Sequence, residues 1–179
     1  MSFKYDLYLS YHCDSIELAK EFYKKLVNEQ NLRIFMNDLS NSQSEHIANI
    51  SMINQSNGFI CLFNKGFIES QECKHELKYA ANNKIKIFLL KIENITPNYL
   101  LKTDKDLLVI LAYGTFNFYD KFGTTDLDKN TFALLVKSIR DSFKTMESIK
   151  QSDSWETRLY RNGKYEGEIL NVYKTILLN

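Results

Sequence analysis

The sequence of 179 residues has one proline and six glycines, and its three cysteines include no CxxC pair. This spacing matches neither a disulfide framework nor a structural zinc site, so we expect three reduced thiols. The three histidines stand singly, and no metal site is predicted. The formal net charge is only +1, which creates no long-range field toward nucleic acid or an anionic membrane. We therefore expect no nucleic-acid partner.

The sequence also lacks a long apolar run. The longest, from Leu107 to Tyr113, is far shorter than the roughly 20 residues that cross a bilayer. The first residues, MSFKYDLYLSYHCDS, mix polar and apolar side chains, whereas a signal peptide needs an unbroken apolar segment. We expect no membrane insertion and a cytoplasmic location.

What the chain does contain is a regular alternation of apolar and amphipathic segments. Hydrophobic residues make up 44% and charged residues 25%, as in ordinary globular domains. The predicted strands are residues 5–10, 32–36, 58–63, 85–90 and 107–112. The predicted helices cover about residues 15–27, 44–55, 70–82 and 129–145. A loop containing Pro97 is predicted between the last two strands.

The order of these segments predicts the fold class. Strands of nearly continuous apolar character, separated by helices, form a parallel sheet that is covered on both faces. Five such strands predict an α/β fold with a flavodoxin-like, doubly wound, five-stranded parallel sheet. We assign this domain to residues 1–148 and a C-terminal extension to residues 149–179.

The extension carries a different pattern. Asn162-Gly163 lies between two strand-like segments, and this pair is typical of a tight β-hairpin turn. The segment LYRNGKYEGEILN also resembles a single MORN repeat, with matches at Tyr165, Gly167 and Glu168. Two interpretations remain: a β-hairpin docked on the domain, or one copy of a repeat array that continues beyond this chain.

Parallel sheets bind ligands at the carboxyl ends of their strands, so the segments after the first three strands are the places to look. YDLYLSYHCDS, from Tyr5, looks like the (F/Y)DxFISYxxxD box of one family. IFMND and the polar loop at residues 37–45 look like its second box and its BB loop. SQECKHEL, from Ser70 to Leu77, is similar to its SxWCxxEL box. In this order and spacing, over residues 4–147, the chain resembles the TIR (Toll/interleukin-1 receptor) domain family.

The resemblance implies two kinds of function. Some TIR domains cleave NAD between nicotinamide and ribose, and the glutamate that they use aligns with Glu76. A protein of this kind takes NAD as substrate, needs no cofactor, releases ADP-ribose or a cyclic form, and acts in immune or cell-death pathways. Other TIR domains, including those of Toll-like receptors that carry the same glutamate, are non-catalytic scaffolds. Both kinds self-associate, and we expect the contact to involve residues 37–47.

The chemistry requires little machinery at Glu76. Nicotinamide is already a cationic leaving group, and one carboxylate can stabilise the oxocarbenium-like transition state. On the helical pattern, Glu76 lies beside the apolar stripe of Cys73 and Leu77, so we expect it to project into an open groove. Glu72 lies one turn earlier, and two adjacent carboxylates disfavour joint ionisation.

The other candidates for the NAD cleft come from strand ends and from the start of the third predicted long helix: Ser10, Tyr11, His12, Arg33, Asn37 and Glu72. Tyr11 can stack on a base or pack in the core, and His12 and Arg33 can approach phosphate. Ser10 can contact ribose or close a turn, while Asn37 can simply end its strand. Two departures from the family pattern stand out: Glu72 replaces the usual tryptophan, and the loop at 37–45 has no glycine or proline.

Overall fold

The computed structural model describes four stretches of the chain, residues 3–36, 46–111, 115–118 and 129–151. The chain divides into two compact units, Met1–Ile139 and Arg140–Asn179, and the sheet lies in the first. The predicted hairpin or MORN-like repeat around Asn162 falls outside the described residues.

Within the described residues, five strands form one parallel sheet: β1 (Tyr5–Ser10), β2 (Ile34–Met36), β3 (Ser56–Phe63), β4 (Lys86–Lys91) and β5 (Thr115–Asn117). Their order across the sheet is β2-β1-β3-β4-β5. In the parallel register, Leu7 lies beside both Ile34 and Gly58, and Leu89 lies beside Thr115. This strand order defines the flavodoxin-like arrangement, and the predicted fold class is confirmed.

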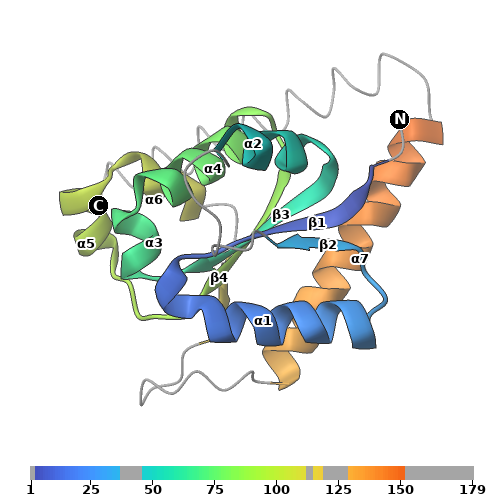
Figure 1. Ribbon diagram of the computed structural model, residues 1–179, viewed down its shortest axis with the longest axis horizontal. Coiled ribbons are helices and arrows are strands. Elements are labelled where there is room, and N and C mark those ends of the chain that lie inside the picture. Colours follow the sequence, from blue (N-terminus) through green and yellow to red (C-terminus); the bar gives the residue numbers. More distant parts are fainter. Residues whose placement is uncertain (1–2, 37–45, 112–114, 119–128, 152–179) are drawn as a thin grey trace, which may run out of the picture. The chain divides into compact units, whose positions relative to one another are not determined.

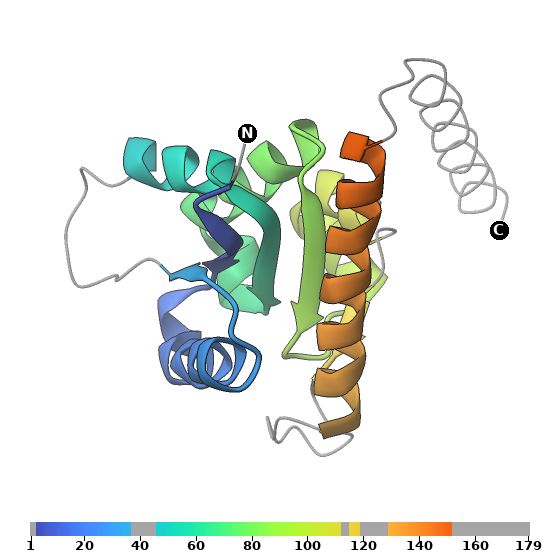
Figure 2. The same ribbon diagram turned by 90° about the vertical axis from the view of Figure 1, so that its right-hand side faces the viewer.

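The described helices follow the strands in the alternation expected of this fold. They are η1 (Cys13–Ser15, a 3-10 turn), α1 (Ile16–Lys24), η2 (Lys25–Glu29, a π-helical turn), α2 (His46–Asn54), α3 (Lys65–Glu69), α4 (Gln71–Asn82), α5 (Pro97–Thr103), α6 (Asp106–Leu111) and α7 (Lys129–Gln151). The helices α2 and α4 lie on one side of the sheet, and α1 lies on the other (Figure 1). In Figure 2 the strands β1, β3 and β4 are seen between α2 above and α1 below.

The face toward α2 and α4 holds a continuous apolar core. Successive side chains of a strand point to opposite faces, so the residues that β3 and β4 contribute to it are two positions apart, and β1 adds Tyr8. Its buried residues are Tyr8, Ile53, Phe59, Cys61, Phe63, Phe67, Ile68, Cys73, Leu77, Ala80, Ile87, Leu89, Ile95, Leu100 and Leu107.

The opposite face packs against α1 and the part of α7 that belongs to the first unit. Leu7 and Leu9 of β1 are fully buried there. The ring of Phe22 on α1 meets Phe118 edge-on at 5.0 Å between centroids and Phe132 of α7 at 6.2 Å. Both faces of the sheet are therefore covered, which explains why its central strands are apolar along their whole length.

The prediction of a strand at residues 107–112 is wrong. This segment begins in α6, and the fifth strand is β5, which pairs with β4. The carboxylate of Asp104 accepts the backbone N–H of Asp106 at 3.2 Å, a turn that aspartate commonly forms before a helix. A short apolar run has no periodicity that separates a buried strand from a buried helix. The sequence signal for a helix was the pair of aspartates, Asp104 and Asp106, that comes before this apolar run.

The predicted loop around Pro97 also contains a helix, α5. Thr96 caps it, because its hydroxyl oxygen accepts the backbone N–H of Tyr99 at 3.3 Å. Pro97 occupies the first turn, where its missing N–H group has no helical partner to lose. The Thr-Pro pair therefore starts a helix within the segment that was predicted to be a loop.

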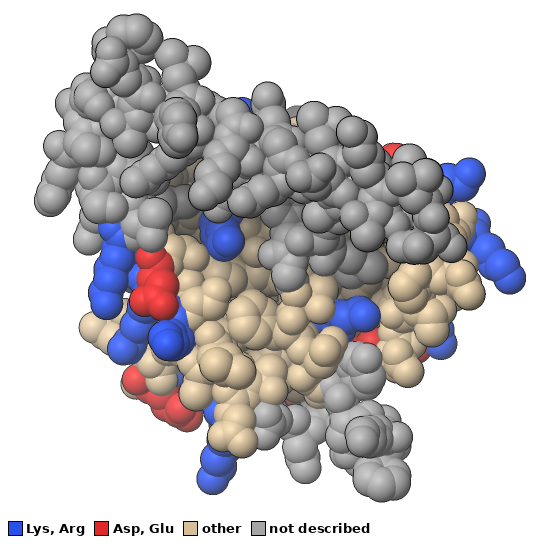
Figure 3. Space-filling model, turned by 180° about the vertical axis from the view of Figure 1, so that it is seen from behind, with Lys and Arg blue, Asp and Glu red and all other residues tan. Residues whose placement is uncertain are grey.

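The described surface carries mixed charge. On the face seen in Figure 3, basic and acidic side chains lie close together along one edge, beside an area of uncharged side chains. Among the residues placed by the structure, no helix has the length and apolar character needed to cross a bilayer.

An ion pair joins the start of β1 to the residue before β2. The carboxylate of Asp6 accepts hydrogen bonds from the backbone N–H of Arg33 at 2.7 Å, from its Nε at 3.2 Å and from its Nη2 at 2.8 Å. Burial acts to raise the pKa of Asp6, but the hydrogen bonds and the charge of Arg33 outweigh it and lower that pKa.

We expect Asp6→Asn to lower the free energy of unfolding at neutral pH by about 1 kcal/mol, because the Arg33 side chain of this pair is largely exposed. A lowered pKa in the folded state stabilises the protein above the unfolded-state pKa, and this contribution is lost as the pH falls through the folded-state pKa. Urea unfolding at about pH 7 and about pH 3 should therefore show a difference that is smaller in acid. Glu17→Gln, which breaks an exposed pair with Lys20, is the control and should change little.

Candidate active site

Three elements bring polar side chains together at the carboxyl end of β1. Tyr8 and Ser10 are two residues apart in this strand, so both point to the face covered by α2 and α4. Glu76 comes from α4 and Asn49 from α2. All four residues are buried beneath the two helices.

The helical periodicity of α4 places Glu76 on the side of the helix that faces Tyr8, Ser10 and Asn49. The helix is capped by Ser70, whose hydroxyl oxygen accepts the backbone N–H of Cys73 at 3.3 Å. From there, Cys73, Glu76, Leu77 and Ala80 follow the spacing of a single helix face, and all four are buried. Glu76 is only 7% exposed. The expectation that it lies off the apolar stripe and projects into an open groove is therefore wrong, because it shares the inward face.

The carboxylate of Glu76 accepts three hydrogen bonds from neutral groups. Its Oε1 accepts the hydroxyl of Tyr8 at 2.9 Å and the side-chain amide of Asn49 at 2.9 Å. Its Oε2 accepts the hydroxyl of Ser10 at 2.7 Å. These donors replace the water that a carboxylate loses on burial, and they hold both oxygens in defined directions.

The Tyr8 hydroxyl is itself held in position by neighbouring rings. Tyr8 lies between Phe35 of β2 and Phe59 of β3, in register with both. Its ring stacks on Phe35 at 5.5 Å and on Phe59 at 5.6 Å between centroids. The phenol therefore has little freedom to turn away from Glu76.

Burial determines the protonation of two side chains beside Glu76. Burial, reinforced by the Glu76 charge, raises the pKa of Tyr8 well above its usual value, so the phenol remains a donor. Burial also raises the pKa of Cys73 to about 12, against an opposing hydrogen bond to Ser70. The Cys73 thiol contacts the backbone carbonyl of Tyr11 at 3.6 Å. Cys73 is thus a protonated packing residue and no thiolate nucleophile at neutral pH.

A small pocket adjoins the carboxylate. Its lining residues are Tyr8, Leu9, Ser10, Tyr11, Asn49, Glu72, Cys73 and Glu76. Its volume is about 40 Å³, enough for a few water molecules. Ligand pockets commonly measure about 300–1,000 Å³, so this pocket is an opening beside the carboxylate and does not by itself enclose a dinucleotide. Glu76 is therefore turned inward yet still borders a space that reaches the surface.

The candidates from the sequence are divided among several places. Ser10, Tyr11 and Glu72 line the pocket together with Glu76, as their positions at strand and helix ends indicated. His12 is not among the lining residues. Arg33 precedes β2 at the opposite end of the sheet, where it pairs with Asp6. Asn37 and the loop at residues 37–45, which the sequence assigned to self-association, lie outside the described residues.

Two residues of the site were not found from the sequence. Tyr8 could have been inferred, because alternation along β1 places it on the same face as Ser10. Asn49 had a weaker signal, a polar side chain in a helix of mainly apolar residues. Its contact with Glu76 spans 27 positions and depends on how α2 packs against α4. Local sequence patterns do not specify such a contact.

The strand order and the helices on both faces define an α/β domain of the doubly wound class, with a polar pocket at the strand ends. The family model described as "TIR domain" matches residues 4–94, just over half of the chain. The chain belongs to the TIR domain family.

Many solved structures are similar to the chain, and three of them illustrate the range. The TIR domain of the Toll-related receptor TRR-2 from Hydra magnipapillata is 18% identical, with 60% of this chain and 91% of that chain covered and a TM-score of 0.46. A flavodoxin-like domain from Synechococcus is 16% identical, with 79% and 99% covered and a TM-score of 0.47. The TIR domains of the activated Roq1 resistosome, which recognises the effector XopQ, are 16% identical, with 97% and 99% covered and a TM-score of 0.45. No curated protein matches the chain. Family membership therefore rests on the match over residues 4–94.

We expect Tyr8→Phe to lower the free energy of unfolding by roughly 1–3 kcal/mol, because it removes a donor from a buried carboxylate and leaves the ring in place. Chemical denaturation of the purified chain measures the change. Tyr99→Phe is the matched control, since its hydroxyl also donates to a glutamate, Glu69, but at the surface. If both variants lost the same free energy of unfolding, burial would not be what makes the Tyr8 hydrogen bond stabilising.

Proposed function

We propose that this TIR domain self-associates and cleaves NAD at the bond between nicotinamide and ribose, with Glu76 as the catalytic carboxylate. One observation carries the proposal. A buried, hydrogen-bonded carboxylate borders a pocket at the carboxyl ends of the strands, where folds of this class bind ligands. The position of Glu76 in the SQECKHEL segment matches the glutamate of NAD-cleaving relatives.

In the proposed reaction, the bond between C1′ of the ribose and the nicotinamide nitrogen breaks. Its electron pair stays on that nitrogen, so the cationic ring leaves as neutral nicotinamide. Water attacks C1′ and loses a proton, which gives ADP-ribose. If a nucleophile within the same molecule attacks instead, the product is a cyclic form. The carboxylate of Glu76 stabilises the positive charge that develops on the ribose.

The three donors to Glu76 prepare the carboxylate for this role. Tyr8 and Asn49 both bind Oε1 and hold the side chain in one orientation, so it need not reorganise during the reaction. Ser10 binds Oε2 and lines the pocket at the end of β1. An incoming ribose hydroxyl can take the place of the Ser10 hydroxyl on this oxygen. The substrate would thus meet a carboxylate that is already aligned.

The size of the pocket supports a site that is completed by assembly. The pocket, at about 40 Å³, gives access to the carboxylate but leaves most of an NAD molecule outside it. A second copy of the chain supplies the remaining surface in this proposal. Contact between copies involves residues 37–47, of which 37–45 lie outside the described residues. The proposed protein acts in the cytoplasm, in an immune or cell-death pathway.

The second candidate is a non-catalytic TIR–TIR scaffold. The observation in its favour is the burial of Glu76, which is only 7% exposed and has donors on both oxygens. In this view the network is a structural link between α2, α4 and β1. The two candidates differ in whether NAD turns over and agree on self-association.

The deciding experiment incubates the purified chain with NAD at increasing protein concentrations and follows nicotinamide release by chromatography. We expect release that rises more than proportionally with concentration. Glu76→Gln should reduce it roughly 10²–10³-fold, because the isosteric amide keeps the shape and loses the charge. Glu69→Gln removes the same charge from α3, outside the pocket, and should leave the rate unchanged.

Each alternative outcome has a definite meaning. Equal turnover of wild type and Glu76→Gln would remove the catalytic role of this carboxylate. No release at any concentration, together with oligomers in sedimentation, would select the scaffold. Circular dichroism of each variant separates loss of the reaction from loss of the fold.

A further inference from the structure

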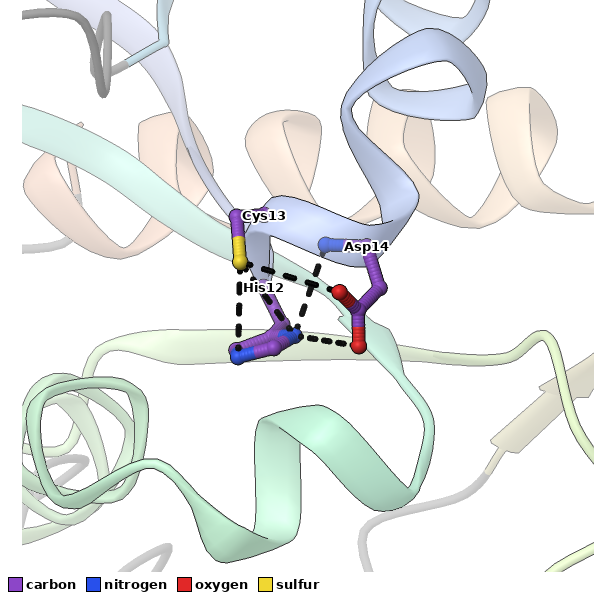
Figure 4. Close-up of side chains that lie close together, drawn as sticks. All are labelled: His12, Cys13 and Asp14. Carbon is purple, nitrogen blue, oxygen red and sulfur yellow. Dashed lines mark hydrogen bonds and ion pairs between the residues drawn. The ribbon is translucent and has the colours of Figure 1, made fainter.

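A second group of reactive side chains lies immediately after β1. His12, Cys13 and Asp14 direct an imidazole, a thiol and a carboxylate toward one another (Figure 4). One donor atom from each lies within 4.8 Å of the others. None of the three lines the pocket beside Glu76, so the proposed cleavage of NAD leaves them without a role.

The separations match those of ligands around a single small cation. Around a tetrahedral zinc ion, with bonds of about 2.0–2.3 Å, neighbouring donors lie about 3.3–3.5 Å apart. The Cys13 sulfur is 3.6 Å from Nε2 and 3.8 Å from Nδ1 of His12. The Asp14 carboxylate lies 3.8 Å from the sulfur through its Oδ1 and 3.1 Å from Nδ1 through its Oδ2. One donor atom of each residue lies within 4.8 Å of the others, so rotation of these side chains would bring three donors onto one ion.

The chemistry of the donors selects the kind of ion. Imidazole nitrogen and thiolate sulfur suit zinc and similar transition metals, whereas magnesium and calcium prefer oxygen ligands. A bound thiolate and carboxylate together balance the two charges of such an ion. They also offset the positive end of the α1 helix, which would otherwise disfavour a cation.

An ion can reach this cluster from solvent, and the His12 ring is held in one orientation. Cys13 is exposed, and the side chain of Asp14 is 71% exposed, so an ion can reach them from solvent. The side chain of His12 is 25% exposed, and its ring lies against Gly66 of α3. A Cβ atom at position 66 would collide with this ring, so glycine is what lets the imidazole adopt its place. The competing interaction, from the Asp14 N–H to Nδ1, is long at 3.4 Å.

We propose that His12, Cys13 and Asp14 form a binding site for a divalent transition-metal ion of the zinc class, with water as the fourth ligand. Three protein ligands and one exchangeable position are the usual composition of an open zinc site. The sequence predicted no metal site because zinc motifs are expected to have ligands separated along the chain. Here His12 caps the 3-10 turn η1 and Cys13 and Asp14 begin it, so three consecutive residues come together instead.

Cobalt(II) and zinc(II) titrations of the reduced, metal-free chain test this proposal without NAD. We expect one cobalt ion per chain and a thiolate-to-cobalt charge-transfer band, followed by displacement with zinc. Cys13→Ser should abolish the band, and His12→Ala should weaken zinc binding at least about tenfold. His75→Ala is the matched control, because it removes a histidine from α4 outside the cluster, and binding should not change.

A further variant tests the geometry while keeping every donor. Gly66→Ala should weaken zinc binding, because the added methyl group displaces the His12 ring. No charge-transfer band in the wild-type chain would overturn the proposal. Zinc affinity that is equal in wild type, His12→Ala and Cys13→Ser would overturn it as well. Since binding is measured without NAD, the result is independent of whether Glu76 is catalytic.

Discussion

The buried carboxylate of Glu76 is the constraint on which the arrangement of β1, α2 and α4 depends. A carboxylate that loses its hydration costs several kcal/mol unless protein donors replace the water. Tyr8, Ser10 and Asn49 provide those donors from a strand and a second helix. Each hydrogen bond therefore also determines where a helix stands over the sheet. The rings stacked on Tyr8 extend this requirement to the strands on either side.

Stability alone does not account for such a network. Apolar residues at all four positions would fill a similar volume without desolvating a charge, and replacements of this kind are often neutral or stabilising. The polar cluster also lies at the strand ends, where doubly wound folds bind ligands. These two facts favour a chemical role. The small pocket beside Glu76 leaves most of a dinucleotide outside it, and this is why the proposed site includes a partner copy.

The fold was largely predictable from the sequence because strands buried on both faces have a distinctive apolar composition. The exception, residues 107–112, shows the limit of that signal, since a buried helix has the same composition. The motif singled out Glu76 as a candidate, but it did not predict the orientation of the side chain. Glu76 follows Cys73 by three positions in α4. This spacing is compatible with a side chain on the buried face of the helix and with one at the edge of that face. Asn49 was missed because helix packing, and no local pattern, brings it to Glu76.

The ladder of aromatic rings has a mechanical consequence for the carboxylate. Phe35 belongs to β2, the edge strand of the sheet, and the segment 37–45 follows this strand directly in the chain. Phe35 supports the ring of Tyr8, whose hydroxyl is bonded to Glu76. A partner protein that binds the chain just beyond Met36 and displaces β2 would therefore displace the Tyr8 ring as well. The hydrogen bond from the Tyr8 hydroxyl to Oε1 of Glu76 would then weaken. The proposed self-association through residues 37–47 and the position of the carboxylate would thus be coupled through two stacked rings, Phe35 and Tyr8.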